Sequence, residues 1–581
     1  MRPDAAVLEA GTNQLKRGLS SRLAYKMGQA SGLSVVANVG KHQAKAGLNC
    51  QPEYLSVSWC LTTVPTTSTE IPIAGISESI APRQPIGRYR GWAPAVCLTL
   101  LSLLYVVPTC VHAAREKLWF DEILTLDAAS LFPSLKTFWA FLKQVEASPP
   151  LAIAVAAGSE SIFGKNEFGL RFPSVVAFPV MALCLYLFLS RRLPRPFAIA
   201  AMLLTFLTAA GRYSYEGRPY ALVLALAGIA LVAWQAAAEG RRRRTALVAL
   251  AGALMAALFS HPMAVTLAIP FVAGELTRTI QRRRVDWPVW CAFAAATPML
   301  LVLWRIKTGG NFSSYLRFNG SFTWHLLVTY MEMLGPAIVP LVLAVLLLAL
   351  LRTPGTSAAK PAPGMRGYEL AALAGFALIP LAAVPLSLWA GHYYLRYSLN
   401  CTIGLAGLLA ILLSRIGGRN RMSQAAVLLV FSVSFAIVQL RPEEKRPDFG
   451  LKVVNSSEKI QPFLERMPTD APIAICPPMT FLELEHYSSP GLAARLYYLT
   501  DPQMAAVIDG NILFDTDIPL LARFVHFRAH FEDYHSFIAA HKRFYVVQPV
   551  RNIARQEALG KLRLEPRKTA DHFQYFEASV L

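Results

Sequence analysis

Long apolar runs separated by short polar connections make up the middle of this chain. The first run spans 92–111 and follows Arg83, Arg88 and Arg90. Ten more runs lie at 171–190, 196–212, 217–237, 245–259, 262–276, 286–305, 334–352, 368–390, 396–415 and 421–440. Most approach the roughly 20 residues with which a helix crosses a hydrocarbon core. The pattern predicts a mainly α fold, a polytopic bundle of about eleven transmembrane helices.

One further apolar stretch, 149–163, is too short to span a membrane comfortably. It opens on Pro149-Pro150, which suits the start of a helix. We expect an interfacial or re-entrant helix here.

Positive charge lies in every second connection between the runs. The residues are Arg191, Arg192 and Arg195; Arg241–Arg244; Arg278 and Arg282–Arg284; Arg352, Lys360 and Arg366; and Arg415, Arg419 and Arg421. Basic connections stay in the cytoplasm. The segment 112–170, the loop 306–333 and the tail after Leu440 are therefore expected outside.

The two ends of the chain differ from the middle, so we expect three domains. Residues 1–88 are rich in small and polar residues and lack periodicity, which predicts a disordered N-terminal extension or a misassigned start. The transmembrane domain covers 89–440. Residues 441–581 regain charge; 471–475 and 544–547 are predicted strands, and 481–487 and 553–562 predicted helices. This tail should form a small extracytoplasmic α/β domain.

Composition supports an integral protein of the cytoplasmic (inner) membrane. The chain is 54% hydrophobic and 16% charged, whereas soluble domains carry about 25% charged residues. The net charge of +20 would also suit a nucleic-acid partner, but the arginines cluster between apolar runs, where topology explains them. The eight cysteines form no C-x-x-C pair. We expect no cofactor and no metal centre, with assistance by a divalent metal left open.

Trp119-Phe120-Asp121-Glu122 follows the first run, in a segment expected outside the membrane. Adjacent carboxylates beside a bilayer are unusual. An acid in this place can transfer protons on a lipid-borne substrate. An ordinary pair of acids at the start of a helix is the alternative.

Further motifs follow this tetrapeptide in a fixed order. They are Pro149-Pro150-Leu151, the stretch from Phe163 to Ser174 (FGKNEFGLRFPS), Arg218-Pro219-Tyr220-Ala221-Leu222, Arg396-Tyr397 and Arg446-Pro447-Asp448-Phe449. In residue type, order and spacing the set resembles the polytopic GT-C glycosyltransferases, namely protein O-mannosyltransferases, lipid A aminoarabinose transferases and Rgt-like enzymes. The resemblance covers about 90–450. It departs from the family pattern at Ser148, where the family has His, and at Ala152-Ile153, where it has an aromatic pair.

The resemblance implies an inverting glycosyltransferase that moves a sugar from a polyprenyl-phosphate carrier to a lipid, glycan or protein acceptor outside the membrane. By resemblance, Asp121 is the general base, and Glu122 positions the acceptor or braces a nearby cation. Arginine is well suited to the lipid phosphate, because its planar fork is always charged.

Five further residues are candidates for substrate binding. Arg171 either binds the phosphate or is a membrane-edge anchor that pairs with Glu167. Arg218 either lines the cavity or pairs with Glu216. Arg396, at an outer helix end, is a candidate phosphate ligand; Tyr394 beside it also suits an aromatic belt. His261 either contacts substrate or has a structural role at a helix turn.

Two other functions stay open at this point. A transporter or flippase for an envelope lipid or glycan would share the polytopic architecture, but it would place ionisable residues inside the spans. A non-catalytic scaffold of envelope assembly would tolerate the loss of Asp121.

Overall fold

The computed structural model describes residues 92–146, 148–307, 322–351, 364–389, 394–418, 420–441, 457–508, 513–547, 553, 557, 560–568 and 574–581. Several predictions lie outside these residues. They concern the extension 1–88, the part of the external loop at 308–321, the connection with Arg352 and Lys360, the motif 446–449 and most of the helix 553–562.

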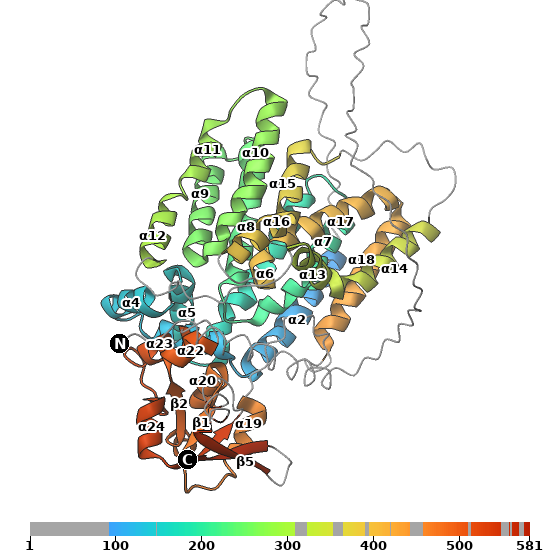
Figure 1. Ribbon diagram of the computed structural model, residues 1–581. Coiled ribbons are helices and arrows are strands. Elements are labelled where there is room, and N and C mark those ends of the chain that lie inside the picture. The colour runs from blue at the N-terminus through green and yellow to red at the C-terminus, as the bar shows by residue number, and fades with distance from the viewer. Residues whose placement is uncertain are drawn as a thin grey trace, which may run out of the picture. The chain divides into compact units, whose positions relative to one another are not determined.

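Between Trp92 and Leu440, the elements that the structure describes are all helices (Figure 1). They are α2 (Trp92–Arg115), α3 (Phe120–Ser130), α4 (Leu135–Phe141), η1 (Leu142–Glu146), α5 (Pro150–Phe163), α6 (Glu167–Leu189), α7 (Arg195–Phe206), η2 (Ala209–Tyr215), α8 (Tyr220–Ala238), α9 (Arg243–Ser260), η3 (Pro262–Leu267), α10 (Ala268–Arg282), α11 (Trp287–Ala294), α12 (Pro298–Lys307), α13 (Phe322–Leu334), η5 (Gly335–Ala337), α14 (Ile338–Leu350), α15 (Gly367–Ala377), α16 (Ile379–Trp389), η6 (Leu395–Ser398), α17 (Cys401–Gly417) and α18 (Arg421–Leu440).

All eleven predicted runs are helical. Among the described residues, seven helices are long and apolar enough to cross a membrane, and a bent pair makes an eighth. The other three runs appear as shorter apolar helices, at Thr99–Arg115, Trp287–Val302 and Cys401–Gly417. The stretch predicted as interfacial is the 14-residue α5. The polytopic bundle is confirmed.

Two runs are irregular, and one predicted loop was wrong. The run 196–212 is bent by 72° between α7 and η2. The run 286–305 is one apolar stretch whose helix is interrupted at 295–297, between α11 and α12, just before Pro298. The expected loop 306–333 becomes helical at Phe322, where α13 begins a 29-residue candidate span that continues through α14.

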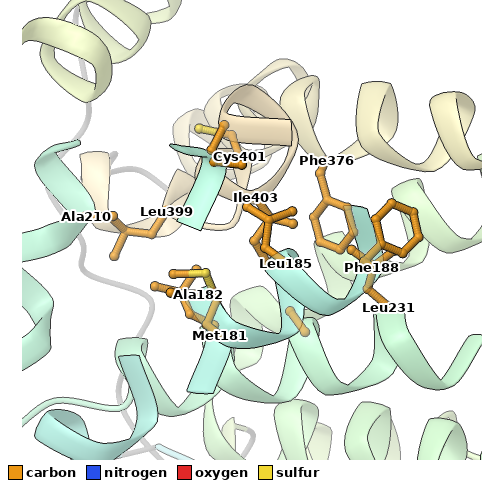
Figure 2. Close-up of a cluster of buried hydrophobic side chains, with 14 of the residues drawn as sticks. Met181, Ala182, Leu185, Phe188, Ala210, Leu231, Phe376, Leu399, Cys401 and Ile403 are labelled. Carbon is orange, nitrogen blue, oxygen red and sulfur yellow. The ribbon is translucent and has the colours of Figure 1, made fainter. Parts of the chain in front are cut away.

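The core of the bundle is formed by large side chains from helices far apart in sequence. Figure 2 shows Leu185 and Phe188 of α6, Leu231 of α8, Phe376 of α15 and Ile403 of α17 gathered in one cluster. Each of these five side chains is buried. This packing holds the helix ends that carry the polar residues described below.

Buried charges gather where the basic connections meet. Arg192, which follows α6, pairs with Glu239 after α8 at 2.5 Å and with Glu369 of α15 at 2.9 Å. Near them, Arg278 pairs with Glu275 and Asp286. Helix ends that the alternation of charge assigns to one side of the membrane are thus in direct contact.

The tail is a small α/β domain, as predicted. Its sheet has the order β3-β2-β1-β4-β6-β5, in which β1 to β4 are parallel and β5 and β6 antiparallel. Its elements are α19 (Ser457–Leu464), β1 (Ile473–Ile475), α20 (Pro478–Tyr487), α21 (Pro490–Ala493), β2 (Leu496–Thr500), α22 (Pro502–Ile508), α23 (Leu513–Leu521), β3 (His530–Asp533), α24 (Tyr534–Ala540), β4 (Arg543–Val547), β5 (Leu562–Lys568) and β6 (Gln574–Val580).

This α/β domain packs against the segment that carries Asp121 and Glu122. Phe120 of α3 and Phe481 of α20 belong to one buried cluster. The Phe120 N–H donates to Glu483 at 3.2 Å, and the Leu118 N–H donates to the Tyr487 hydroxyl oxygen at 2.6 Å. The start of α3 is therefore held from two sides, by the helical bundle and by the α/β domain.

Candidate active site at the start of α3

Asp121 and Glu122 lie in the first turn of α3, after the N-cap residue Trp119. Successive residues of a helix do not face the same direction. The two carboxylates accordingly have different surroundings: Glu122 is completely buried, whereas Asp121 is 13% exposed.

Glu122 forms a buried ion pair with Arg171 of α6. The guanidinium donates from Nε to Oε1 at 2.8 Å and from Nη2 to Oε2 at 2.6 Å. The same carboxylate accepts the backbone N–H of Trp119 at 3.3 Å and of Gly217 at 2.6 Å. One side chain thus joins α3, α6 and the turn before α8.

Two glycines make this arrangement possible. A Cβ on Gly217 would lie 2.7 Å from Leu170 and 3.2 Å from Glu122 Oε1, so a side chain here would separate the backbone from the carboxylate. A Cβ on Gly169 would lie 2.1 Å from the Gly164 carbonyl oxygen. Gly169 therefore permits the tight turn into α6 that places Arg171.

The remaining donors of Arg171 are also satisfied. Nη1 donates to the carbonyl oxygens of Ala113 and Glu116, and Nη2 donates to that of Lys117. A guanidinium has five N–H groups, and each has a protein acceptor here. The predicted pairing with Glu167 is wrong, since Glu167 accepts from the Tyr487 hydroxyl instead. No donor is left for the phosphate contact predicted for Arg171.

Asp121 lies between two arginines brought together from distant parts of the chain. Its Oδ2 is 3.2 Å from Arg218 Nη2 and 3.4 Å from Arg396 Nη1. That oxygen is buried and accepts no hydrogen bond from any described residue, so both contacts are ion pairs without hydrogen-bond geometry. Arg218 pairs with Asp121, and it also lies close enough to Glu216 to lower the pKa of that carboxyl. These pairs are looser than that of Glu122 with Arg171.

Aromatic rings surround the two arginines. The Arg218 and Arg396 guanidinium carbons lie 6.0 and 5.9 Å from the centre of the Trp119 ring. Arg396 also lies 4.2 Å from the Tyr394 ring. The face of a ring attracts a cation. Trp119 therefore helps to hold both cations beside Asp121. The sequence motif did not predict this role, because the two arginines lie far from Trp119 along the chain.

His261 precedes η3 close to the same group. Its Nδ1 accepts the Met263 N–H at 3.2 Å, and its ring lies 5.2 Å from Tyr220 and 5.9 Å from Tyr397. By accepting this hydrogen bond, His261 caps η3, which is a structural role. Its ring also lines a cavity, so the residue is placed for both roles.

That cavity is small, with a volume of about 50 Å³, and it opens to the surface. Arg218 and His261 line it together with Ser148 and Ala152, the positions at which the chain departs from the family pattern. Small side chains at these two positions leave space in front of Arg218. The cavity lies between α5, α6, the turn before α8 and the end of α9.

Glu216 adds an ionisable group that the motifs did not single out as functional. Burial, together with nearby Glu122, raises the pKa of Glu216 to about 7, against the lowering effect of Arg212, Arg218 and Arg396. Its carbonyl oxygen accepts from the Ser174 hydroxyl at 2.6 Å. The sequence shows that Glu216 lies two residues before Arg218. Its proximity to Glu122 could be recognised only from the folded structure.

Metal ligands do not gather in the described part of the chain: it contains no group of three or more His, Cys, Asp or Glu side chains that could hold an ion. The charged groups that do converge are Asp121, Arg218 and Arg396. This set suits recognition of an anion next to a carboxylate.

Comparison with known proteins agrees with the motif-based expectation. Residues 147–304 match the family model of dolichyl-phosphate-mannose-protein mannosyltransferases. The crystal structure of apo ArnT from Cupriavidus metallidurans aligns with 84% of this chain and 98% of that chain, at 12% identity and a TM-score of 0.52. No curated protein sequence matches.

Two other solved structures are less similar. ArnT from Cupriavidus metallidurans bound to undecaprenyl phosphate aligns at 14% identity with a TM-score of 0.49, over 84% and 98% of the two chains. The arabinosyltransferase EmbB from Mycobacterium smegmatis aligns at 17% identity with a TM-score of 0.36, over 58% of this chain and 32% of that chain.

The chain is therefore an integral membrane protein with the fold of the polytopic GT-C glycosyltransferases, as its motifs predict. The matched family segment includes α5, α6 and α8, and hence Arg171, Arg218 and the cavity.

Proposed function

We propose that this protein is an inverting glycosyltransferase that takes a sugar from a polyprenyl-phosphate carrier and places it on an acceptor outside the cytoplasmic membrane. The observation that carries the proposal is the contact of Asp121 with Arg218 and Arg396. A base and two phosphate-binding cations are the groups that such a transfer needs.

In the proposed reaction the acceptor hydroxyl oxygen attacks the anomeric carbon from the side opposite the phosphate. Asp121 takes the hydroxyl proton. The bond between the anomeric carbon and the phosphate oxygen breaks, and its electron pair leaves with the lipid phosphate. Arg218 and Arg396 stabilise the negative charge that develops there. The sugar is left on the acceptor with its anomeric configuration inverted.

The loose geometry at Asp121 fits a site whose ion pairs exchange on binding. The Nε of Arg396 is buried and has no hydrogen-bond acceptor among the described residues. A phosphate that reaches Arg396 and Arg218 offers oxygens to these donors and competes with Asp121 for them. Donor binding then releases the carboxylate to act as a base. In this scheme the lipid phosphate is the leaving group, and its binding also frees Asp121 to act as the base.

The open side of the cavity beside Arg218 is the proposed place of the sugar, because the cavity itself holds only about 50 Å³. Because Arg218 lines the cavity and also contacts Asp121, a sugar on the bound phosphate can lie between them. His261 and Ser148 present polar atoms to the same space. Tyr394 is 45% exposed and covers Arg396, which suits a contact with the lipid near the phosphate.

Glu122 and Arg171 have a positioning role in this proposal. Their buried pair fixes the first turn of α3 against α6 and Gly217. Asp121 and Arg218 adjoin Glu122 and Gly217 in sequence, so the pair sets the distance between the base and one of its cations.

The transporter alternative receives less support from the fold. The buried acidic side chains Glu239, Glu275 and Glu369 lie toward the helix ends that meet the basic connections and pair with arginines there, whereas Glu332 lies half-buried within the candidate span Phe322–Leu350. A transport pathway would place such groups within the spans. The scaffold alternative is tested directly by assay.

Membranes containing the protein should consume a radiolabelled polyprenyl-phosphate sugar and release the free lipid phosphate. Undecaprenyl phosphate is the first carrier to try, since ArnT from Cupriavidus metallidurans has been solved with it. Consumption of one sugar donor, absent from membranes that lack the protein, supports the proposal. Failure with every donor favours the scaffold.

A further inference from the structure

A second cavity lies among the arginines that follow α6 and α8. It is formed by the ends of α6 and α8 and the start of α9, which pack in that order. Its volume is about 460 Å³, and it is open on one side. Neither Asp121 nor the residues around it line this cavity.

The walls of the cavity are apolar and small. They are formed by Cys184, Ile229, Val232, Ala233, Ala236, Thr245, Ala246 and Ala249. The lining residues extend from Ile229 to Ala236 on α8 and from Cys184 of α6 to Arg191 just after it, a separation of seven residues in each case. Seven residues correspond to about 10 Å along a helix, so the groove runs from the basic connections well into the apolar part of the bundle.

Three arginines stand at the polar end of this groove: Arg191, Arg241 and Arg242. Arg191 and Arg241 share one carboxylate, Glu239, at 3.2 and 3.1 Å, and Glu239 also serves Arg192. Arg242 forms no ion pair with any residue in the part of the chain that the structure describes. Positive charge is therefore in excess here, and burial, with Arg241 and Arg192 nearby, lowers the pKa of Arg191.

The backbone at this end is unusual as well. Arg242 has φ of 41°, in the left-handed region that favours glycine. It is the N-cap of α9, and its side chain does not cap the helix. The first N–H groups of α9 therefore add a partial positive charge next to the arginines.

We propose that this groove binds a diacyl phospholipid with an anionic headgroup, from the leaflet that adjoins the basic connections. The acyl chain would lie against Ala233 and Ala249, and the phosphate would lie among Arg191, Arg241 and Arg242. Apolar walls that end in more arginines than carboxylates are complementary to a lipid of this charge, and basic pockets between transmembrane helices are suited to acidic headgroups. The proposal does not depend on the catalytic assignment.

The test uses the full-length protein, delipidated in detergent and titrated with dioleoyl phosphatidylglycerol or dioleoyl phosphatidylcholine. Native mass spectrometry counts the bound lipids. The two probes share acyl chains and a phosphate but differ in net charge. We expect phosphatidylglycerol to be retained more tightly. Equal retention of the two lipids would overturn the proposal.

Two variants locate the site. Arg241→Gln/Arg242→Gln removes two charges at about 1 kcal/mol each, so phosphatidylglycerol should bind about 30-fold more weakly. Ala249→Phe fills the groove and leaves the charges in place, and it should also reduce retention. Ala249 is exposed on α9, so the larger side chain does not disturb the core.

Each variant has a matched control on the same protein. Arg283→Gln/Arg284→Gln removes two charges from another basic connection, and Arg283 also has a positive φ of 50°. Val248→Phe enlarges the exposed neighbour of Ala249, which does not line the groove. Both controls should bind lipid as the parent does. An equal loss of lipid binding in the test variants and the controls would show that lipid associates with the protein surface non-specifically. That result would contradict a defined binding site.

Discussion

The guanidinium of Arg171 donates two hydrogen bonds to the carboxylate of Glu122, at 2.8 and 2.6 Å, within a fully enclosed site. The carboxylate of Asp121, one residue earlier, meets its two arginines only at 3.2 and 3.4 Å. Adjacent residues with the same functional group thus differ in how firmly they are held. We infer that Glu122 stabilises the fold and that Asp121 takes part in the reaction.

This division predicts that substitutions at the two pairs differ in their effect on stability. Removal of one partner from a buried ion pair costs about 3–5 kcal/mol, because the other charge stays buried. Arg171→Met should therefore lower the thermal midpoint sharply and reduce the yield of folded protein. The double variant Glu122→Gln/Arg171→Met should recover part of the loss. Asp121→Asn is the control, with a midpoint near that of the parent; a sharper loss for Asp121→Asn than for Arg171→Met would reverse the assignment.

Arg396 should determine affinity for the donor phosphate. A hydrogen bond to a charged group contributes about 1.5–3 kcal/mol, so Arg396→Ala should weaken donor binding about 10- to 100-fold. Arg396→Lys should recover only part of this, since a point charge does not replace the planar fork. Binding of radiolabelled undecaprenyl phosphate to the purified protein measures the effect. Arg441→Ala, which removes an exposed arginine after α18, should bind normally. Unchanged binding in Arg396→Ala would remove the residue from the phosphate site.

The distribution of arginines predicts the orientation in the membrane. A reporter that is active only outside the cytoplasm should be active when fused after Leu581 and silent when fused after Arg244. The reverse pattern would place Asp121 in the cytoplasm and contradict the proposed donor and acceptor side.

Asp127 predicts a pH dependence of stability. Burial, with Glu485 and Glu160 nearby, raises the pKa of Asp127 from 3.8 to about 7 in the folded protein. A raised carboxyl pKa favours the protonated folded form. Its stabilising contribution is complete below about pH 4 and is lost as the pH rises through 7. Asp127→Asn should therefore raise the thermal midpoint more at pH 8 than at pH 5. An equal change at both pH values would show that Asp127 is already ionised in the fold.

Much of the bundle could be predicted because apolar runs and helix length follow directly from the hydrocarbon thickness. The errors arose where local chemistry interrupts or dilutes a run. One predicted span is interrupted just before Pro298, and Thr323, His325 and Glu332 lowered the apolarity of α13 enough to suggest a loop. In the α/β domain, the buried strand β1 and the buried residues 544–547 of β4 were predicted, whereas the partly exposed β5 and β6 were not.

The residues of the site were predicted from motifs, but their pairing was not. Arg171 has the residue type and helix position of a phosphate ligand, and nothing in its neighbourhood shows that it reaches Glu122 across 49 residues. The pairing depends on the close approach of the Gly217 backbone to the Glu122 carboxylate. The sequence shows a glycine before Arg218 but does not reveal this contact. Contacts between residues so far apart in sequence follow from helix packing and cannot be predicted from the spacing of residues within a motif.

The central claim is that Asp121 is the general base, and sugar transfer by purified Asp121→Asn tests it most directly. The asparagine keeps the shape of the side chain but removes the basic lone pair, so donor binding should survive while the rate falls about 10²- to 10⁴-fold. The assay follows radiolabelled sugar leaving undecaprenyl phosphate, with bound donor measured in the same preparation. A normal transfer rate in Asp121→Asn would contradict the account.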